Sequence, residues 1–113
     1  MTNQMIDLAT FHELKETMGE DFIPELVATY LEEIPELLKT LKQGLEDGNA
    51  QTFTRAAHSI KSSSASMGAL DFAAQARELE MIGKSGDLSQ AGAHVDRLVA
   101  TYPEVEQALR NLL

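Results

Sequence analysis

Apolar residues recur along this chain at steps of three, four and seven, which places them on one face of a helix. The longest such pattern comprises Phe22, Leu26, Tyr30, Leu37, Leu41 and Leu45. It predicts one long helix from about Asp21, with Pro24 tolerated in its first turn. Pro35 removes one backbone hydrogen bond and is expected to kink this helix. Gly44 and Asp47-Gly48 are expected to end it.

A shorter helix is predicted before the long one. Asp7 can cap it through its side chain, and the pattern continues through Lys15, with Gly19 just beyond the end. The residues expected to be buried on this helix are Leu8, Phe11 and Leu14.

Three more helices are predicted in the second half of the chain, over about residues 49–68, 70–82 and 88–112. Asn49 caps the first of them and Gly68 ends it, while residues 83–86, Gly-Lys-Ser-Gly, connect the other two. Pro103 is expected to kink the last helix. The inward positions are Phe53, Ala57, Ile60, Ser64, Met67, Phe72, Ala76, Leu79, Val95, Leu98, Tyr102, Val105 and Leu109.

These elements predict an all-α fold. The sequence has no alternating strand pattern, and short connections favour antiparallel neighbours. We therefore expect an antiparallel up-down-up-down four-helix bundle with a short additional N-terminal helix, formed by residues 1–113 as a single domain.

Charge and composition narrow the classes of function. Nine Lys and Arg against 18 Asp and Glu give a net charge of −9, which argues against nucleic acid or an anionic membrane as a partner. The chain has no cysteine and no apolar run of membrane-spanning length. We expect a soluble, cytoplasmic monomer.

One face of the third predicted helix differs from an ordinary helix surface. At 3.6 residues per turn, Thr54, His58, Lys61, Ser62 and Ala65 share this face, and the large apolar residues lie on the opposite side. No Asp or Glu occurs from Asn49 to Leu70. The four serines between residues 62 and 66 favour a loop by propensity, and such a conflict between local preference and the larger pattern often marks a functional site.

The run His58-Ser-Ile-Lys61-Ser62-Ser-Ser-Ala65-Ser-Met-Gly68 resembles the signature of histidine-containing phosphotransfer (HPt) domains, His-x-Leu-Lys-Gly-x-x-x-x-x-Gly. The resemblance extends over essentially the whole chain, because the flanking helices also fit. Ile60 stands in place of the usual leucine, and Ser62 in place of the usual glycine.

The resemblance implies that His58 carries a phosphoryl group between receiver-domain aspartates and that Lys61 assists by electrostatic stabilisation. Glu80 would orient His58, although Glu78 is an equal neighbour on the same helix. Ser62, Ala65 and Thr54 would contact the partner, and Gly68 would form a structural turn. The implied partners are receiver domains of response regulators and of hybrid sensor kinases.

Other chemistry finds little support in the sequence. We interpret His12 and His94 as solvated surface groups. The sequence offers no His-x-x-x-His or Glu-x-x-His pattern, so we expect no metal, and we expect no cofactor. The sequence has no glycine-rich loop of the kind that binds phosphates, so we expect the chain to have no kinase activity of its own. The alternative interpretation is a non-catalytic helical adaptor that only docks receiver domains.

Overall fold

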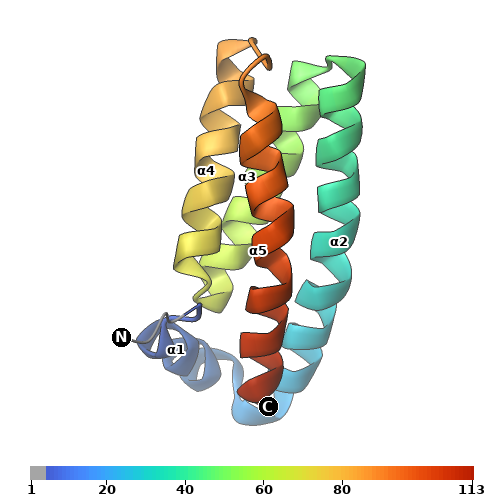
Figure 1. The fold of residues 1–113 in the computed structure, drawn as a ribbon. Helices are drawn as coiled ribbons and strands as arrows, with labels where there is room; N and C mark the ends of the chain where they lie inside the picture. Colours follow the sequence, from blue (N-terminus) through green and yellow to red (C-terminus); the bar gives the residue numbers. More distant parts are fainter. Residues whose placement is uncertain (1–4) are drawn as a thin grey trace, which may run out of the picture.

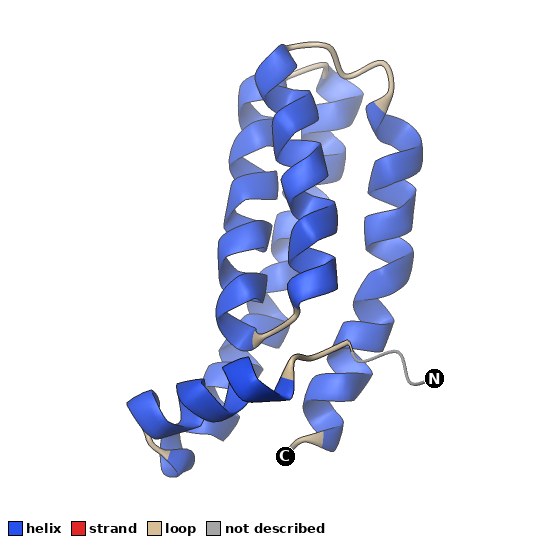
Figure 2. Cartoon of the chain, turned by 90° about the vertical axis from the view of Figure 1, so that its left-hand side faces the viewer, coloured by secondary structure: helices blue, strands red, loops and turns tan. Residues whose placement is uncertain are grey.

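A computed structural model describes residues 5–113, which form five α-helices and one short 3-10 helix. Their bounds are α1 Leu8–Met18, η1 Glu20–Phe22, α2 Ile23–Asp47, α3 Ala50–Met67, α4 Leu70–Ser85 and α5 Ala91–Asn111. The four longer helices α2 to α5 run up, down, up and down, and α1 lies across the lower end of the bundle (Figure 1 and Figure 2). α3 packs between α2 and α4, and α5 packs against α4 and α2. The predicted four-helix bundle with an additional N-terminal helix is confirmed.

Side-chain caps and glycines set several helix ends where the sequence places them. Asp7 accepts a hydrogen bond from the backbone N–H of Thr10 at 3.1 Å, and Asn49 accepts one from Thr52 at 3.1 Å. α3 ends at Gly68, whose φ of 89° is a left-handed conformation that favours glycine. The Asn49 cap and Gly68 thus fix the start and the end of α3, the helix that carries His58.

The buried stripe predicted on α3 is confirmed. Phe53, Ala57 and Ile60 are fully buried, and Met67 is 3% exposed. Ser64 is also fully buried, and its hydroxyl hydrogen-bonds the hydroxyl of Tyr30 on α2 at 2.7 Å. A buried hydroxyl needs such a partner, so this pair holds α3 in one rotation against α2. That rotation turns His58 outward.

Several expectations about the first half of the chain are wrong. α1 continues to Met18 rather than Lys15, and Leu8 is 40% exposed because it begins the helix at the edge of the bundle. α2 begins at Ile23 after a 3-10 turn, which leaves Phe22 41% exposed. The side chains that α2 buries most deeply are Ile23, Val27, Tyr30, Ile34, Leu38 and Leu41, while Leu26, Leu37 and Leu45 flank them.

Gly83 belongs to α4 and not to the connection predicted over residues 83–86. A Cβ at Gly83 would collide with the side chains of Thr54 and Phe53, so this glycine permits a close approach of α3 and α4. Gly86, with φ of 81°, ends α4. The last helix begins at Ala91, three residues later than predicted, because residues 86–90 form the turn.

The prolines predicted to lie inside helices do so. Pro35 lies within α2 and Pro103 within α5, and both helices continue past them. The kinks expected there stay predictions. Across residues 5–113, none of the helices combines the length and the apolar character needed to cross a membrane.

Candidate functional site

His58 projects from the middle of α3 into solvent. Its side chain is 57% exposed, and the face around it carries small residues. Ser62 and Ala65, one and two turns along the helix, are both exposed. The imidazole therefore stands on a face that a second macromolecule can approach closely.

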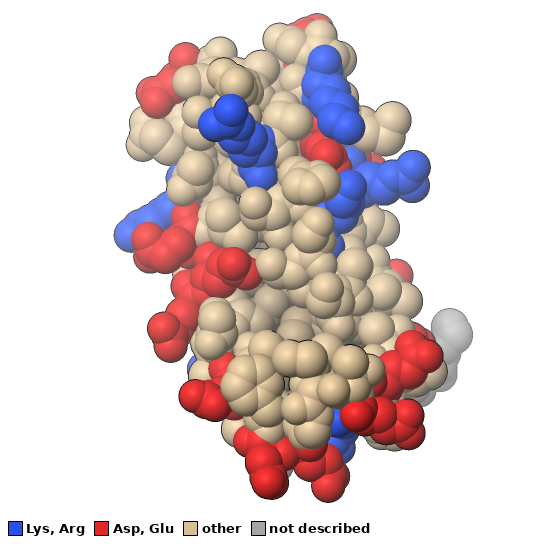
Figure 3. Space-filling model, turned by 180° about the vertical axis from the view of Figure 1, so that it is seen from behind, with Lys and Arg blue, Asp and Glu red and all other residues tan. Residues whose placement is uncertain are grey.

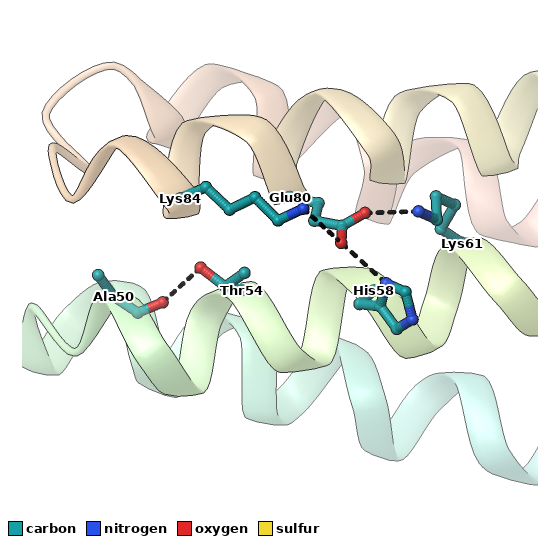
Figure 4. Close-up of polar contacts among 6 residues, drawn as sticks. All are labelled: Ala50, Thr54, His58, Lys61, Glu80 and Lys84. Atoms are coloured by element: carbon teal, nitrogen blue, oxygen red, sulfur yellow. Dashed lines mark hydrogen bonds and ion pairs between the residues drawn. The ribbon is translucent and has the colours of Figure 1, made fainter.

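Glu80 of α4 reaches across to this histidine. Its Oε2 lies 2.8 Å from Nδ1 of His58, and its Oε1 lies 2.7 Å from Nζ of Lys61 (Figure 4). The glutamate is only 5% exposed. His58, Lys61 and Glu80, which were predicted to act together, are thus joined through one buried carboxylate. The alternative residue, Glu78, is exposed and contacts His94 instead.

A second lysine, which the sequence analysis missed, completes the cluster. Nζ of Lys84 lies 3.6 Å from Oε2 of Glu80, one helical turn further along α4 (Figure 4). Its side chain is 67% exposed, whereas that of Lys61 is 31% exposed. The spacing of four residues between Glu80 and Lys84 is the signal that could have found it, because such pairs meet on one helix face. We refer to His58, Lys61, Glu80 and Lys84 as the ion cluster.

The ion cluster keeps Glu80 ionised. The hydrogen bond from Lys61 is the main cause that lowers the pKa of Glu80 to about 2, against the opposing effect of burial. An ionised carboxylate only accepts hydrogen bonds, so the bond to His58 requires the proton on Nδ1. In the neutral imidazole this leaves a lone pair on Nε2, the ring nitrogen that points away from Glu80 (Figure 4).

This lowered pKa predicts a pH dependence of stability. A carboxyl whose pKa falls on folding stabilises the protein fully above its unfolded pKa, here 4.5, and loses that contribution as the pH falls through its folded pKa, here about 2. We expect the difference in melting temperature between the parent and Glu80→Gln to persist above pH 4.5 and to shrink towards pH 2. Thermal unfolding followed by circular dichroism measures both curves. Parallel curves over this range would contradict the prediction.

Gly68 and Thr54 make structural contacts. The carbonyl of Gly68 accepts a hydrogen bond from the backbone N–H of Asp7 at 2.7 Å, which joins the start of α1 to the end of α3. The Thr54 hydroxyl donates to the carbonyl of Ala50 at 2.7 Å (Figure 4). It also lies against Gly83. Thr54 is half-buried between the two helices, at the edge of the face that carries His58.

The two other histidines lie away from the ion cluster. His12 is exposed on α1. His94 on α5 is a half-buried surface residue, with Nδ1 at 3.4 Å from Glu78 Oε2. Within residues 5–113, no group of three or more His, Cys, Asp or Glu residues is arranged to hold a metal ion.

Comparison with known proteins agrees with this geometry. The family model described as Hpt domain matches residues 25–113. The phosphorelay protein LuxU of Vibrio cholerae is 27% identical over 100 residues, which are 88% of either chain. The crystal structure of histidine-containing phosphotransfer protein B (HptB) from Pseudomonas aeruginosa PAO1 is 30% identical, with a TM-score of 0.91 over 97% of this chain and 95% of HptB. The chain therefore belongs to the Hpt domain family and is a phosphotransfer intermediate of phosphorelay signalling.

Proposed function

We propose that His58 accepts a phosphoryl group from the aspartate of one receiver domain and passes it to the aspartate of another. The observation that supports this most directly is the pairing of Nδ1 with the buried Glu80 beneath an exposed ring. This pairing fixes the tautomer in which Nε2 is the nucleophile. The same bond holds the ring in one orientation, so less orientational entropy is lost when the attacking geometry is reached.

During the transfer, the phosphoryl group is carried only by side chains of the two proteins, the receiver's aspartate and His58. The lone pair on Nε2 attacks the phosphorus of an aspartyl phosphate, the N–P bond forms, and the P–O bond to the aspartate breaks with its electron pair on the carboxylate. The proton on Nδ1 stays in place, so the ring becomes cationic. Glu80, ionised at neutral pH, stabilises that cation. Transfer to the next aspartate is the same step in reverse.

Lys61 supplies positive charge to the transferred group under this proposal. It lies one turn from His58 on α3. Lys61→Ala is therefore expected to slow transfer on the order of tenfold to a thousandfold without abolishing it, because the nucleophile remains. The measurement is the rate of phosphoryl uptake from a phosphorylated receiver domain, with Lys42→Ala on α2, an exposed lysine outside the ion cluster, as the control. Equal rates for the two variants would make Lys61 a surface charge only.

The partner is proposed to dock on the outward face of α3. Ser62 and Ala65 let a second backbone approach His58, and Thr54 forms the edge of this face. Below it, a groove of about 300 Å³ between α1, α2 and α3 is lined by apolar side chains that include Leu14, Leu26 and Met67. In many protein complexes an apolar groove of this kind binds the apolar face of a partner's helix.

Charge on this face is unevenly distributed. Figure 3 shows it from behind the view of Figure 1, with Lys and Arg gathered over the upper half and Asp and Glu over the lower end. Arg55 and Lys84 belong to the upper parts of α3 and α4, and Lys61 lies just below the middle of α3. The acidic pocket that surrounds a receiver's aspartate is attracted to this basic half, which supports receiver domains of response regulators and hybrid sensor kinases as partners.

An acid-labile phosphate mapped to His58 after incubation with a phosphorylated receiver domain tests the proposal. The alternative is a helical adaptor that only docks receivers, and it predicts binding without any transfer. Acid lability separates phosphohistidine from phosphoserine, which matters because Ser62 is a near neighbour. Stable phosphate on a serine, or binding with no phosphate, would reject the relay.

We propose that residues 1–113 act as one domain, supported by the burial of Ile6 and Phe11 and by the bond between Asp7 and Gly68. It would act as a cytoplasmic monomer, without a kinase activity or cofactor of its own.

A further inference from the structure

In the unphosphorylated protein, Lys61 is paired with Glu80 and not with the position of the phosphoryl group. Nζ of Lys61 is bonded to Glu80 at 2.7 Å, so in this state the lysine is committed to a carboxylate and not to the phosphoryl position at Nε2. Phosphorylation adds about one and a half to two negative charges there. Lys61 lies one turn from His58 on the same helix, so it is drawn towards the new charge.

Moving Lys61 away from Glu80 has a cost. Glu80 is 5% exposed, and a buried carboxylate oxygen that loses its partner is strongly destabilised. The bond from Nδ1 of His58 satisfies only Oε2. The site therefore needs a second cation that can take over Glu80 when Lys61 turns away.

Lys84 has the position and the freedom to do this. It lies at 3.6 Å from Oε2 of Glu80, beyond hydrogen-bond distance but close enough for an ion pair. Its side chain is 67% exposed and comes from the same helix, four residues after Glu80, so it can move a short distance without disturbing the core. Lys61, which comes from the neighbouring helix α3, has a less exposed side chain, at 31%.

We propose that Lys84 is a positioning residue that takes over the charge of Glu80 when Lys61 turns to the phosphoryl group on His58. Two lysines thus share one buried carboxylate, and their exchange accompanies phosphoryl uptake and release. Lys84 acts through Glu80 and Lys61, without contact with the phosphoryl group. This inference rests on the proposed function of His58.

A double-mutant cycle tests the exchange. Phosphoramidate, a small phosphoryl donor, charges the histidine without any receiver, and intact mass measures the rate. We expect Lys84→Ala to slow uptake about two- to fivefold, the factor that corresponds to an exposed ion pair. In the Lys61→Ala background the same change is expected to have no effect, because no lysine then leaves Glu80. Lys84→Arg is expected to restore the parental rate, and Lys42→Ala to leave it unchanged.

A spectroscopic measurement separates exchange from a purely structural role. The side-chain carboxyl carbon of Glu80 is followed by NMR in the free and the phosphorylated protein. At neutral pH, where the phosphohistidine is stable, we expect the carboxyl chemical shift of Glu80 in Lys84→Ala to match that of the parent in the free protein, where Lys61 still bonds it, and to depart from it in the phosphorylated protein.

The outcomes are distinguishable. An equal slowing in both backgrounds would overturn the proposal, because Lys84 would then act on the phosphoryl group directly. A parental rate for Lys84→Ala, or equal changes of the Glu80 carboxyl chemical shift in both states, would overturn it as well. Parent protein that takes up no phosphate on His58 would instead reject the proposed function itself.

Discussion

His58→Gln is expected to take up no phosphate from a phosphorylated receiver domain while it remains folded. Glutamine lacks the nucleophilic ring nitrogen, yet its amide can still donate a hydrogen bond to Glu80. The substitution removes little packing, because the imidazole is 57% exposed and lies on the opposite side of α3 from the core residue Ile60. The loss is therefore expected to be complete for transfer and small for the melting temperature. Radiolabelled phosphate and thermal unfolding measure the two effects.

The matched control is His94→Gln on α5. His94 is also a partly exposed histidine beside a glutamate, Glu78, but it belongs to the helix on the other side of the bundle. This variant is expected to transfer phosphate at the parental rate. Phosphate uptake by His58→Gln would show that another residue is the acceptor. Early unfolding of His58→Gln would show that the ring supports the fold more than its exposure suggests.

The rotation of α3 could be predicted from the sequence because its two faces differ so strongly. Large apolar residues repeat on one side, and small or polar residues surround His58 on the other. The partner of His58 required more than this pattern. Glu78 and Glu80 are two residues apart on one helix, and only the resemblance to HPt domains favoured Glu80 before the packing of α4 on α3 resolved the choice.

The bonds that join α3 to α4 within the ion cluster could not be predicted from helical spacing. The sequence places Lys61 on the same face as His58, which suggests that the two act on a common ligand. In the structure Lys61 instead reaches across to α4, because the buried Glu80 attracts the nearest cation. Contacts between helices depend on how closely the helices approach, and a single sequence does not specify that distance.

The end of α4 illustrates the same limit. Gly83 and Gly86 give identical signals for a helix end, since glycine is common just after the last turn. Only the proximity of Phe53 and Thr54 shows that Gly83 serves close packing. Because α4 continues to Ser85, Lys84 is helical and lies one turn from Glu80. The misplaced helix end therefore also explains why the second lysine was missed.

The position of the docking face leads to the second large expected effect, that of Ala65→Arg. Ala65 is exposed on α3, two turns from His58 and on the same face. A receiver that brings its phosphoaspartate to Nε2 must cover this position, and an arginine there would hold the two backbones apart. We expect this variant to lose receiver binding and phosphoryl transfer from the receiver. Its melting temperature should stay close to that of the parent, because the side chain extends into solvent.

Two comparisons make the Ala65→Arg result specific. Ala100→Arg introduces the same charge and bulk at an exposed position on α5, across the bundle, and is expected to bind and transfer as the parent does. Phosphoramidate is small enough to reach Nε2 past the new arginine, so it should still charge His58 in Ala65→Arg. Loss of both reactions would mean that the substitution damages the ion cluster rather than the contact. Parental transfer from a receiver would place the docking surface elsewhere, because a large side chain two turns from the nucleophile cannot be accommodated inside a close interface without loss.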